Sequence, residues 1–350
     1  MFAILSLGTQ YYIYTRLKKA GVNKFITRLF AAWGIFLIVA GFVAGFDISH
    51  AEYDILPLHT AELINAIFLT WAIITLLGFF AFFAVNLLPV KQKIFWSIIL
   101  TILATLYGMC EAYFVTARYV TIPTNKLPAG VNKIRLAYIT DSHIGGLSTH
   151  WHFERTMRLV KEADPDIFIS TGDTIDGDMN YRKRELEILT EAAKNSPYGA
   201  FAVNGNHEHY WILDVDVEGI IRGCGFNLLI NERVEAAGIV IVGLDDIRYG
   251  WLKPFLKPGD ENKFVLVLKH RPGIPIDAER KFDLQLSGHT HGGQFWPMGY
   301  FKNFASGSSQ GLSRKAGGYV YVSNGSGFNG AMLRIFVPPE VTIIDIVREN

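Results

Sequence analysis

Cysteine is scarce in this 350-residue chain, and neither sign of charge is in clear excess. The two cysteines, Cys110 and Cys224, lie far apart, and Cys110 falls within an apolar run, so the sequence predicts no disulfide framework. The 33 basic residues almost balance the 32 acidic ones, which gives a formal net charge of +1. Such a chain has no overall electrostatic field that attracts nucleic acid, and we expect no nucleic-acid partner.

Long hydrophobic runs are present instead, and they are concentrated in the first third of the chain. Three of them, 29–46, 66–88 and 95–115, are close to the ~20 residues that cross the hydrocarbon of a bilayer. A weaker run, 2–14, is interrupted by Gln10 and is followed, not preceded, by basic residues. We therefore interpret it as a retained anchor and not as a cleaved secretory signal, and leave open whether it spans fully. Residues 1–116 are predicted to form a helical transmembrane region.

Basic residues are distributed unevenly between the links that join these runs. Two links, before the second run and before the fourth, contain all the basic residues of the region: Arg16, Lys18, Lys19, Lys24, Arg28, Lys91 and Lys93. The link 47–60 between them contains no lysine or arginine. Because cytoplasmic loops carry an excess of these residues, we expect an integral protein of the cell membrane in which everything after the fourth run lies outside the cytoplasm.

The pattern changes after residue 116, where a polar link with two prolines, 123–130, precedes short apolar runs. We predict two helices, at 153–163 and 182–194, and eight strands, at 134–139, 167–170, 200–203, 239–242, 264–268, 282–286, 319–322 and 341–346. The helices separate only the first three strands. This βαβαβ opening, followed by strand-rich sequence, predicts an α/β domain over 117–350, with two sheets packed face to face between helices.

Two histidines, His289 and His291, lie one residue apart in the segment SGHTHGGQ (287–294), directly after a predicted strand. Gly288 and Gly292 allow the backbone to turn tightly there and to come close to a ligand. Taken alone, a close histidine pair on a loop is more often ordinary surface polarity than a pair of metal ligands. The segments that precede this pair favour metal binding.

Side chains that bind metals follow five of the predicted strands, at the carboxyl end of each: Asp141, His143, Asp173, Asn206, His270, His289 and His291. Ligands of open α/β sheets bind beyond the carboxyl ends of the strands, so we expect these side chains to converge. Carboxylate, amide and imidazole donors suit Mn, Fe, Zn or Mg and not thiolate-selected ions. Seven donors are too many for one tetrahedral site, so the set predicts two divalent metal ions that share a bridging carboxylate.

Taken in order, the motifs DSH, GD, GNHE, H and GHTH resemble the pattern of the calcineurin-like metallophosphoesterase superfamily over 134–346. The resemblance implies a four-layer αββα sandwich. It also implies that Asp141, His143 and His291 hold a first metal ion and that Asn206, His270 and His289 hold a second. Asp173 would bridge the two ions. The longer signature GHTHGGQ, followed by Phe295, Trp296 and Pro297, is similar to a branch that carries membrane segments ahead of the enzyme.

The resemblance also gives His207 and Asp176 a role in catalysis. His207 would stand beside the metals and donate a proton to the leaving alkoxide, or contact a phosphoryl oxygen, and general acid catalysis of this kind contributes roughly 10²–10⁴-fold. Asp176 would orient His207 and keep its imidazole protonated. Alternatively, Asp176 only stabilises the turn 173–178. The implied mechanism is in-line attack of a metal-bridging hydroxide on phosphorus.

The sequence thus predicts a membrane-anchored, metal-dependent phosphoesterase that hydrolyses phosphomonoester, phosphodiester or diphosphate bonds. A lipid-linked or cell-envelope substrate is expected, because an anchored domain meets substrates near the bilayer at a raised effective concentration. The alternative is a membrane sensor or receptor that uses the same fold to bind a ligand without turnover, since a fold alone does not fix a function.

Overall fold

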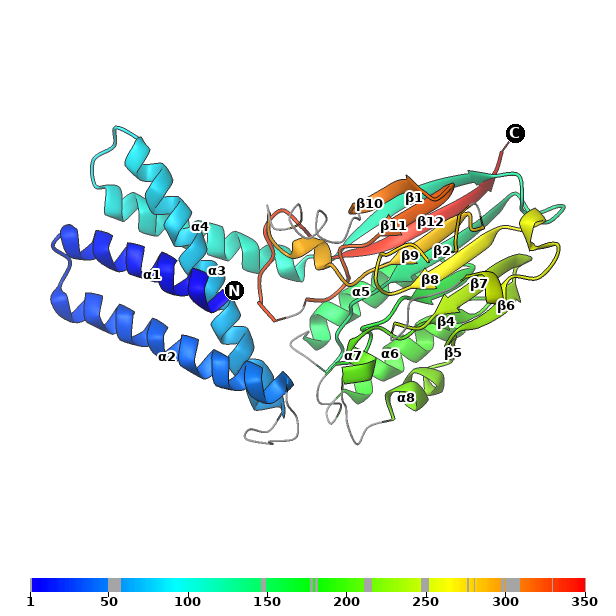
Figure 1. The fold of residues 1–350 in the computed structure, drawn as a ribbon, viewed down its shortest axis with the longest axis horizontal. Coiled ribbons are helices and arrows are strands. Elements are labelled where there is room, and N and C mark those ends of the chain that lie inside the picture. Colours follow the sequence, from blue (N-terminus) through cyan, green and yellow to red (C-terminus); the bar gives the residue numbers. More distant parts are fainter. Residues whose placement is uncertain are drawn as a thin grey trace. The chain divides into compact units, whose positions relative to one another are not determined.

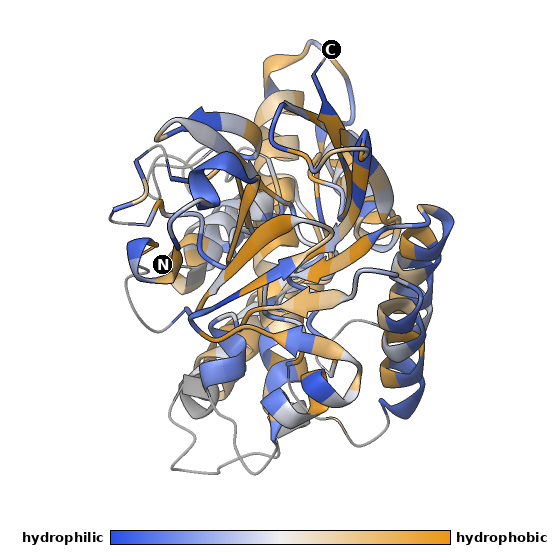
Figure 2. Ribbon diagram, turned by 90° about the vertical axis from the view of Figure 1, so that its right-hand side faces the viewer, coloured by the Kyte–Doolittle hydropathy of each residue, from blue (hydrophilic) through white to orange (hydrophobic). Residues whose placement is uncertain are grey.

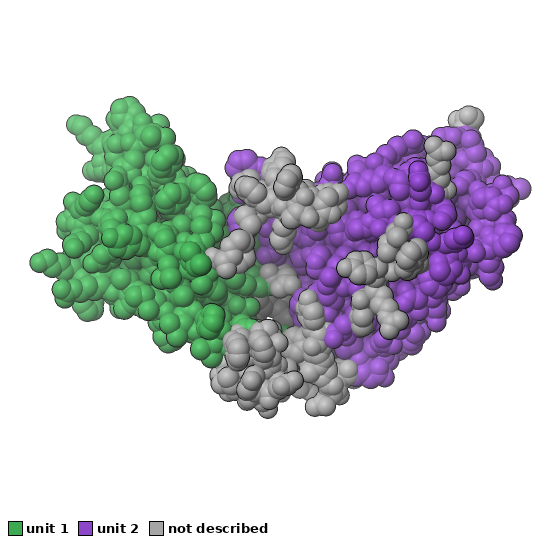
Figure 3. Space-filling model, viewed as in Figure 1, with its two compact units in different colours: residues 1–112, 329–335 green, residues 113–328, 336–350 purple. Residues whose placement is uncertain are grey.

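The computed structural model divides the chain into two compact units (Figure 3), Met1–Ala112 with Asn329–Ile335, and Tyr113–Phe328 with Phe336–Asn350. The chain therefore leaves the second unit for the short segment 329–335 and then returns to it. The structure describes these residues: 2–49, 58–145, 149–176, 179, 182–210, 216–246, 252–275, 277–279, 281–296, 299, 309–328 and 330–349.

Helices form the first unit (Figure 1): α1 (Phe2–Lys19), α2 (Lys24–Ser49), α3 (Leu58–Leu87) and α4 (Lys93–Tyr113). Three of them contain stretches long and apolar enough to cross a membrane, at Lys24–Gly45, Thr60–Leu87 and Lys93–Tyr113. Each of the three long predicted runs therefore forms such a helix. The helices start earlier than the runs because hydropathy marks only the apolar part of a helix, while backbone hydrogen bonding continues into its polar ends.

The weak first run also forms a helix, α1, which packs against α2 and α3. The Thr9 hydroxyl donates a hydrogen bond to Thr75 Oγ1 on α3 (3.1 Å), and the Tyr12 ring lies edge-on to Phe79, with 5.0 Å between ring centroids. Later residues of α1 thus meet later residues of α3, so the two helices run in the same direction. Gln10, which interrupts the run, is buried and donates to the carbonyl oxygen of Ala31 (3.1 Å).

The segment 330–335 belongs to the helical unit although it lies between the last two strands in the sequence. The Met332 N–H donates to Thr70 Oγ1 on α3 (3.1 Å), and the Arg334 N–H donates to the carbonyl oxygen of Gly108 on α4 (2.9 Å). A Cβ at Gly108 would lie 2.9 Å from Ile335 Cδ1, so glycine gives the segment room to cross α4. No hydropathy pattern predicted this packing.

The second unit contains two six-stranded mixed sheets. The order in the first is β1-β12-β2-β3-β4-β5, where the strands are β1 (Thr116–Thr124), β12 (Glu340–Arg348), β2 (Lys133–Ile139), β3 (Ile167–Ser170), β4 (Ala200–Ala202) and β5 (Phe226–Leu228). Strands β2 to β5 are parallel, and β12 is antiparallel to β2 and parallel to β1. Helix α5 (His150–Glu162) connects β2 to β3, and α6 (Lys183–Lys194) connects β3 to β4, which confirms the predicted βαβαβ opening.

The order in the second sheet is β10-β11-β9-β8-β7-β6, where the strands are β10 (Gly311–Lys315), β11 (Gly318–Val322), β9 (Leu284–Ser287), β8 (Val265–Lys269), β7 (Ile239–Leu244) and β6 (Glu232–Ala236). Strands β7, β8, β9 and β11 are parallel, and antiparallel strands β6 and β10 lie at the two edges. The carboxyl ends of β8 and β9 therefore lie at the same edge of this sheet.

The main core lies between the two sheets, whose strands are largely coloured as hydrophobic in Figure 2. Tyr138, Ile169 and Phe201 from the first sheet belong to the same buried cluster as Leu266 and Leu286 from the second. A second cluster lies between the first sheet and helices α5, α6 and α8 (Val217–Gly223). Strands covered on both faces are apolar throughout, which explains why the continuous runs predicted them well.

The outer face of the second sheet is covered differently. Its buried residues pack against Leu252, Phe282 and the 3₁₀ turn η1 (Lys253–Phe255), and no α-helix covers this face among the residues that the structure describes. The mixed α/β class is confirmed, whereas the four-layer αββα arrangement is not. Four strands were also missed, namely β1, β5, β6 and β10. Strands β1, β6 and β10 each expose two or more residues to solvent, and β5 has only three residues, so none makes an apolar run. Strand β1 also overlaps the predicted link 123–130.

Candidate metal centre

All seven predicted ligands lie just beyond the carboxyl ends of five strands, as expected. Asp141 and His143 follow β2, Asp173 follows β3, and Asn206 follows β4 in the first sheet. The remaining three follow strands of the second sheet: His270 after β8, and His289 and His291 after β9. Only His289 is half-buried; the other six side chains are buried.

The loops that carry the first three ligands are held together by their backbones. The His143 N–H donates to the carbonyl oxygen of Asp173 (3.0 Å), and the Ile144 N–H donates to that of Thr174 (2.9 Å). These bonds continue the parallel pairing of β2 and β3 beyond the ends of the strands, as far as an isolated bridge between Ile144 and Ile175. The DSH and GD motifs are thus positioned by main-chain contacts.

Five of the seven ligands have left-handed backbone conformations: Asp141 (φ 54°), His143 (φ 47°), Asp173 (φ 49°), His289 (φ 67°) and His291 (φ 48°). A residue with a Cβ atom pays about 1–3 kcal/mol for such a conformation, which persists only where the surrounding structure imposes it. Strain of this kind gathers at functional sites. Nothing in the spacing of the motifs predicted it.

Two motif glycines are required by the approach of a neighbouring carboxylate. A Cβ at Gly205 would lie 2.2 Å from Asp173 Oδ1, and a Cβ at Gly288 would lie 2.2 Å from Asp141 Oδ2. Both distances are far shorter than any van der Waals contact. The glycines of the GNHE and GHTH motifs therefore make room for the carboxylates.

Asp141, His143 and His291 form one group whose ligand atoms all lie within 4.8 Å of one another. The Nε2 atoms of His143 and His291 face each other at 3.1 Å, and His291 Nε2 lies 3.3 Å from Asp141 Oδ1. The carboxylate of Asp141 also accepts the backbone N–H of His289 (3.0 Å). The predicted first set of ligands is thus assembled around one point.

Asp173, His270 and His289 form a second group within the same 4.8 Å limit. His270 Nε2 lies 3.1 Å from Asp173 Oδ2 and 3.3 Å from His289 Nδ1. The other ring nitrogen, His270 Nδ1, donates to the carbonyl oxygen of Thr171 (2.8 Å), which fixes the ring and directs Nε2 toward the group. Asp173 also belongs to a third group, with His143 and His207, so it lies between the two sets.

Asn206 completes the predicted second set. Its Oδ1 atom is buried and has no hydrogen-bond partner among the residues that the structure describes. A buried acceptor left without a partner is destabilising by about 1–3 kcal/mol, unless a ligand satisfies it. An amide oxygen beside carboxylates and imidazoles is a suitable donor for a divalent cation, so the residues present fit such an ion.

The charges at the centre depend on one another. Burial raises the pKa of Asp173, but the charge and the hydrogen bond of His270 outweigh burial and hold this pKa well below its usual range. Burial lowers the pKa of His270, yet the charge of Asp173 and its hydrogen bond raise it to about 10. Burial dominates at Asp141, whose pKa is raised. Without a metal, His270 is therefore protonated, and a metal ion must displace that proton.

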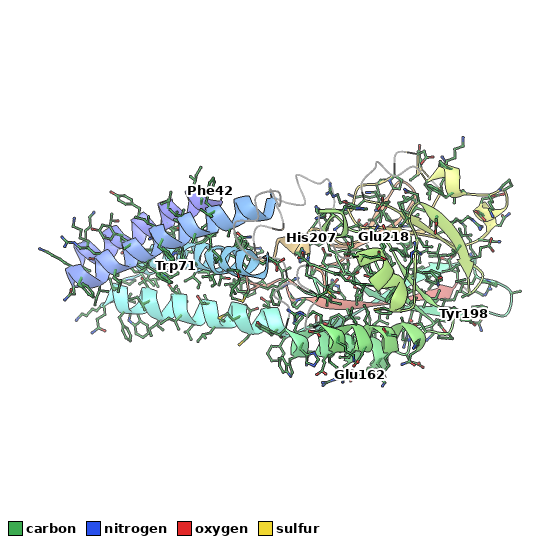
Figure 4. All side chains as sticks on the ribbon, turned by 90° about the horizontal axis from the view of Figure 1, so that it is seen from below. Phe42, Trp71, Glu162, Tyr198, His207 and Glu218 are labelled. Carbon is green, nitrogen blue, oxygen red and sulfur yellow. The ribbon has the colours of Figure 1, made fainter. Side chains whose placement is uncertain are left out.

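His207, labelled in Figure 4, lies at the start of the short helix α7 (His207–Tyr210). Its Nδ1 atom lies 3.0 Å from Asp176 Oδ1, while Asp176 Oδ2 lies 2.9 Å from His143 Nδ1. One carboxylate thus contacts both imidazoles. Burial lowers the pKa of His207, but the hydrogen bond and the charge of Asp176 raise it to about 9. The pair has the geometry predicted for a proton donor and its orienting carboxylate; their part in catalysis stays a prediction.

Glu208 is the residue whose role the sequence did not reveal, although it closes the GNHE motif. Its carboxylate accepts the backbone N–H groups of Gly205 (2.7 Å), Asp173 (2.8 Å) and Thr174 (2.7 Å). It therefore joins the loops after β3 and β4 and positions Asp173. A glutamate three residues after a glycine at a helix start is a weak signal for such backward capping.

Two ion pairs lie directly beside motif residues. Arg271 follows His270, and its Nε atom lies 3.1 Å from the buried Asp246 Oδ2, while 47% of the arginine side chain is exposed. His209 Nε2 lies 2.7 Å from Asp245 Oδ1, and this hydrogen bond raises the pKa of His209. Both aspartates follow β7, so a third strand of the second sheet contributes carboxylates next to the predicted ligands.

The sequence matches the family model of calcineurin-like phosphoesterases over residues 134–293. An uncharacterized metallophosphoesterase of Aquifex aeolicus is 36% identical over 258 residues, which cover 71% of this chain and 97% of the relative. A transmembrane protein with metallophosphoesterase domain from Danio rerio is 29% identical over 276 residues, which cover 71% of this chain and 61% of that protein. The chain therefore belongs to the calcineurin-like metallophosphoesterase family and is a metal-dependent phosphoesterase.

An uncharacterized metallophosphoesterase of Campylobacter jejuni is 30% identical over 234 residues, which cover 63% of this chain and 61% of the relative. Among solved structures, a dimetal phosphatase from Danio rerio has a TM-score of 0.34 at 12% identity, covering 56% of this chain and 88% of that chain. That likeness is too small to compare the two sites residue by residue. The predicted family is confirmed by the sequence relatives, whereas the narrower GHTHGGQ branch stays a prediction.

Proposed function

We propose that this protein is a membrane-anchored phosphoesterase that uses two divalent metal ions to hydrolyse a phosphate ester or diphosphate of a lipid-linked or cell-envelope substrate. The observation that carries the proposal is the placement of His207, whose Nδ1 lies 3.0 Å from Asp176 Oδ1 and whose Nε2 lies 4.0 Å from Asp173 Oδ2. A proton donor with a raised pKa thus adjoins Asp173, the carboxylate that belongs to two of the three groups. A site built only to bind a ligand does not need such a donor.

In this proposal the first ion is held by Asp141, His143 and His291, and Asp173 lies between the two ions. The second ion is held by the remaining donors: Asn206, His270 and His289. When bound, the ions would lower the pKa of a bound water and offset the negative charge that grows on the phosphoryl oxygens. Mn, Fe, Zn and Mg all match this mixture of oxygen and nitrogen donors.

His207 performs the proton transfer. With a pKa of about 9, its imidazole is protonated at neutral pH, and Asp176 holds Nδ1–H so that Nε2–H points toward the ligand groups. In that position Nε2 gives its proton to the leaving alkoxide, which would otherwise depart as a strong base. Asp176 also accepts from His143, so a single carboxylate fixes the proton donor relative to a predicted metal ligand.

Arg271 supplies a contact for the phosphoryl group or for a neighbouring phosphate. Asp246 binds its Nε atom, and the terminal guanidinium nitrogens suit contact with an anion. An arginine anchored at one nitrogen loses little additional freedom when it binds a ligand. We assign it to substrate binding and not to the chemical step.

Residues 1–116 act as the membrane region and 117–350 as the catalytic domain in this proposal, with the catalytic domain outside the cytoplasm. Support comes from the helical unit, where Arg16 and Lys93 both bond to Asn86, so the two basic links lie at the same end. A protein that follows the positive-inside rule has this distribution. Relatives described as transmembrane proteins with a metallophosphoesterase domain also support membrane association.

The proposal is tested by hydrolysis of bis-p-nitrophenyl phosphate and p-nitrophenyl phosphate by the full-length protein in detergent. We expect turnover that chelation abolishes, that added Mn restores, and that His207→Ala lowers by about 10²-fold or more. His150→Ala is the matched control, because that histidine lies on α5 with 45% of its side chain exposed. Absence of turnover with both substrates, in protein shown to contain metal, would favour the sensor alternative.

A further inference from the structure

One end of the helical unit carries all the basic residues of 1–112, and no acidic residue balances them there; the unit's other basic residue, Arg334, lies in the segment 330–335. Residues 1–46 and 63–110 contain neither aspartate nor glutamate. They contain seven basic residues, all in the links at this end: Arg16, Lys18, Lys19, Lys24, Arg28, Lys91 and Lys93. The positive-inside rule accounts for the number of these charges but not for their contacts.

Two of the seven charges converge on Asn86, near the end of α3. The Arg16 guanidinium donates to Asn86 Oδ1, and Lys93 Nζ donates to the carbonyl oxygen of Asn86 (2.9 Å). Asn86 in turn donates through Nδ2 to the carbonyl oxygen of Phe82, one turn earlier (2.6 Å). Both cations are therefore held together by neutral acceptors, and a bound anion would meet them side by side.

An apolar cavity of about 230 Å³ lies in the same unit, and all four helices line it. Its lining includes Leu17 from α1, Phe30 from α2, Phe82 from α3 and Ile98 from α4. Leu17 directly follows Arg16, and Phe82 is the residue that Asn86 bonds to. The cavity thus begins one helical turn from the two cations.

The cavity extends along α3 from Phe82 to Trp71, which Figure 4 labels. These residues are eleven positions apart in the helix, which at 1.5 Å per residue is about 16 Å. The hydrocarbon core of a bilayer is ~30 Å thick, so each leaflet contributes about half of that. The length of the cavity therefore matches the depth of one leaflet, measured from its charged end.

We propose that this end of the helical unit binds an anionic phospholipid of the membrane. Its phosphate contacts Arg16 and Lys93, and one acyl chain fills the cavity from Phe82 toward Trp71. A free phosphate ion has no apolar part to fill the cavity. A zwitterionic lipid brings its own positive charge next to the two cations, so the site selects lipids with a net negative headgroup. The site is separate from the metal centre and does not depend on the proposed activity.

Native mass spectrometry of the full-length protein, released from detergent, measures this binding directly. The probes are phosphatidylglycerol, phosphatidylcholine with the same acyl chains, and inorganic phosphate. We expect retention of phosphatidylglycerol in preference to the other two. The double variant Arg16→Gln, Lys93→Gln should bind phosphatidylglycerol about 30-fold more weakly, given the usual contribution of each basic residue at a membrane surface.

The matched control is Lys18→Gln, Lys19→Gln, which removes the same charge from the same end but not from Asn86. We expect it to bind phosphatidylglycerol almost as well as the wild type. The charge-preserving pair Arg16→Lys, Lys93→Arg should keep most of the binding, which separates loss of the site from loss of folding. If both glutamine double variants bound phosphatidylglycerol equally weakly, the binding would come from the overall positive charge of this end and not from a site at Asn86, and the proposal would be wrong.

Filling the cavity tests the acyl-chain part separately. Thr101 lines the cavity on α4, and Thr101→Leu adds apolar volume there without changing charge. We expect this variant to retain phosphatidylglycerol about 10-fold less well, by analogy with the loss of a few buried methylenes. Unchanged retention in Thr101→Leu, or equal retention of phosphatidylcholine and phosphatidylglycerol by the wild type, would contradict the proposal.

Discussion

The two units differ in how their buried polar side chains are bonded. In the helical unit, most hydroxyl groups bond to the preceding turn of their own helix, as Thr75 does to Ala72 and Thr101 to Ser97, although Thr9 and Gln10 also bond to neighbouring helices. In the second unit, polar groups bond across the chain, as when Asp141 accepts the His289 N–H from 148 positions away. The helices of the first unit therefore follow largely from local sequence, whereas the chemistry of the second unit depends on how its strands are ordered.

Backbone conformation shows the same difference. Within the described helices α1 to α4, no residue other than glycine has a positive φ, whereas five predicted ligands in the second unit do. A regular helix satisfies its backbone internally, so nothing forces its residues into strain. Loops that must bring carboxylates and imidazoles to one point have no such freedom. Substitutions in the second unit should therefore have larger and less local effects.

The largest effect is expected for Asp173→Ala, because this carboxylate belongs to two of the three ligand groups. Loss of the shared ligand should lower kcat/KM by about 10³-fold or more, since bound metal ions contribute several kcal/mol to catalysis. The variant should also contain less metal after dialysis, measured by inductively coupled plasma mass spectrometry. Asp345→Asn is the control, because Asp345 pairs with Arg135 (2.7 Å) and not with a ligand. Equal metal content in the two variants would refute the bridging role.

A large effect on local stability is expected for Glu208→Gln. The uncharged amide accepts fewer and weaker hydrogen bonds from the four backbone N–H groups of Gly205, Asp173, Thr174 and Ile175, so the loops around Asp173 should open more easily, by about 2–3 kcal/mol. Hydrogen exchange of peptides that cover 172–176 measures this opening, while a peptide from β7 serves as an internal reference. Unchanged protection of 172–176 would show that Glu208 does not join the two loops.

Asp176→Asn should produce a smaller effect that depends on pH. Without the carboxylate, the pKa of His207 should fall from about 9 toward its ordinary value. Because the proton donor must be protonated, kcat/KM falls as pH rises through that pKa. The alkaline limb of the pH profile should therefore move down by about 1–2 units in the variant. If the alkaline limb of the pH profile lay at the same pH in Asp176→Asn as in the wild type, the alternative in which Asp176 only stabilises its turn would be favoured.

The smallest effect is expected at the His209–Asp245 pair, which is partly exposed. The pKa of His209 is raised in the folded state. The pair therefore stabilises the fold fully at pH values below the ordinary histidine pKa of about 6.5. This stabilisation is lost as the pH rises through the higher pKa of the folded state. The wild type should lose about 0.5–1 kcal/mol of stability over that range, and His209→Gln should lose less. Chemical unfolding at pH 6 and at pH 9 measures the free energy of unfolding of both proteins. If it changed equally with pH in the wild type and in His209→Gln, the His209–Asp245 pair would not contribute to the pH dependence.

Much of the architecture follows from the sequence because its elements are apolar and locally bounded. Strand β3 was predicted to the residue, and the apolar runs located α2, α3 and α4. Edge strands such as β6 and β10 escaped prediction because none of their residues is buried and two residues of each are exposed. The packing of 330–335 on α3 and α4 also escaped, since it joins parts of the chain that are far apart in sequence.

The candidate site was predicted by the order of its motifs, and the structure brings all seven predicted ligands to the same edge of the two sheets. Their left-handed backbones, the role of Glu208 and the shared contact of Asp176 with two imidazoles were not predictable. Each of these arises from contacts between loops that follow different strands. Motif spacing records which side chains are present, but not which atoms they bond to.

In the proposed reaction, His207 donates a proton to the leaving group. This proton transfer is tested most directly by comparing kcat/KM of wild type and His207→Asn, both loaded with metal, on an alkyl phosphodiester and a p-nitrophenyl phosphodiester. We expect a loss of about 10²–10⁴-fold with the alkyl ester, whose leaving alkoxide needs the proton, and a much smaller loss with the p-nitrophenyl ester. Equal losses with both substrates, at equal metal content, would contradict this role of His207.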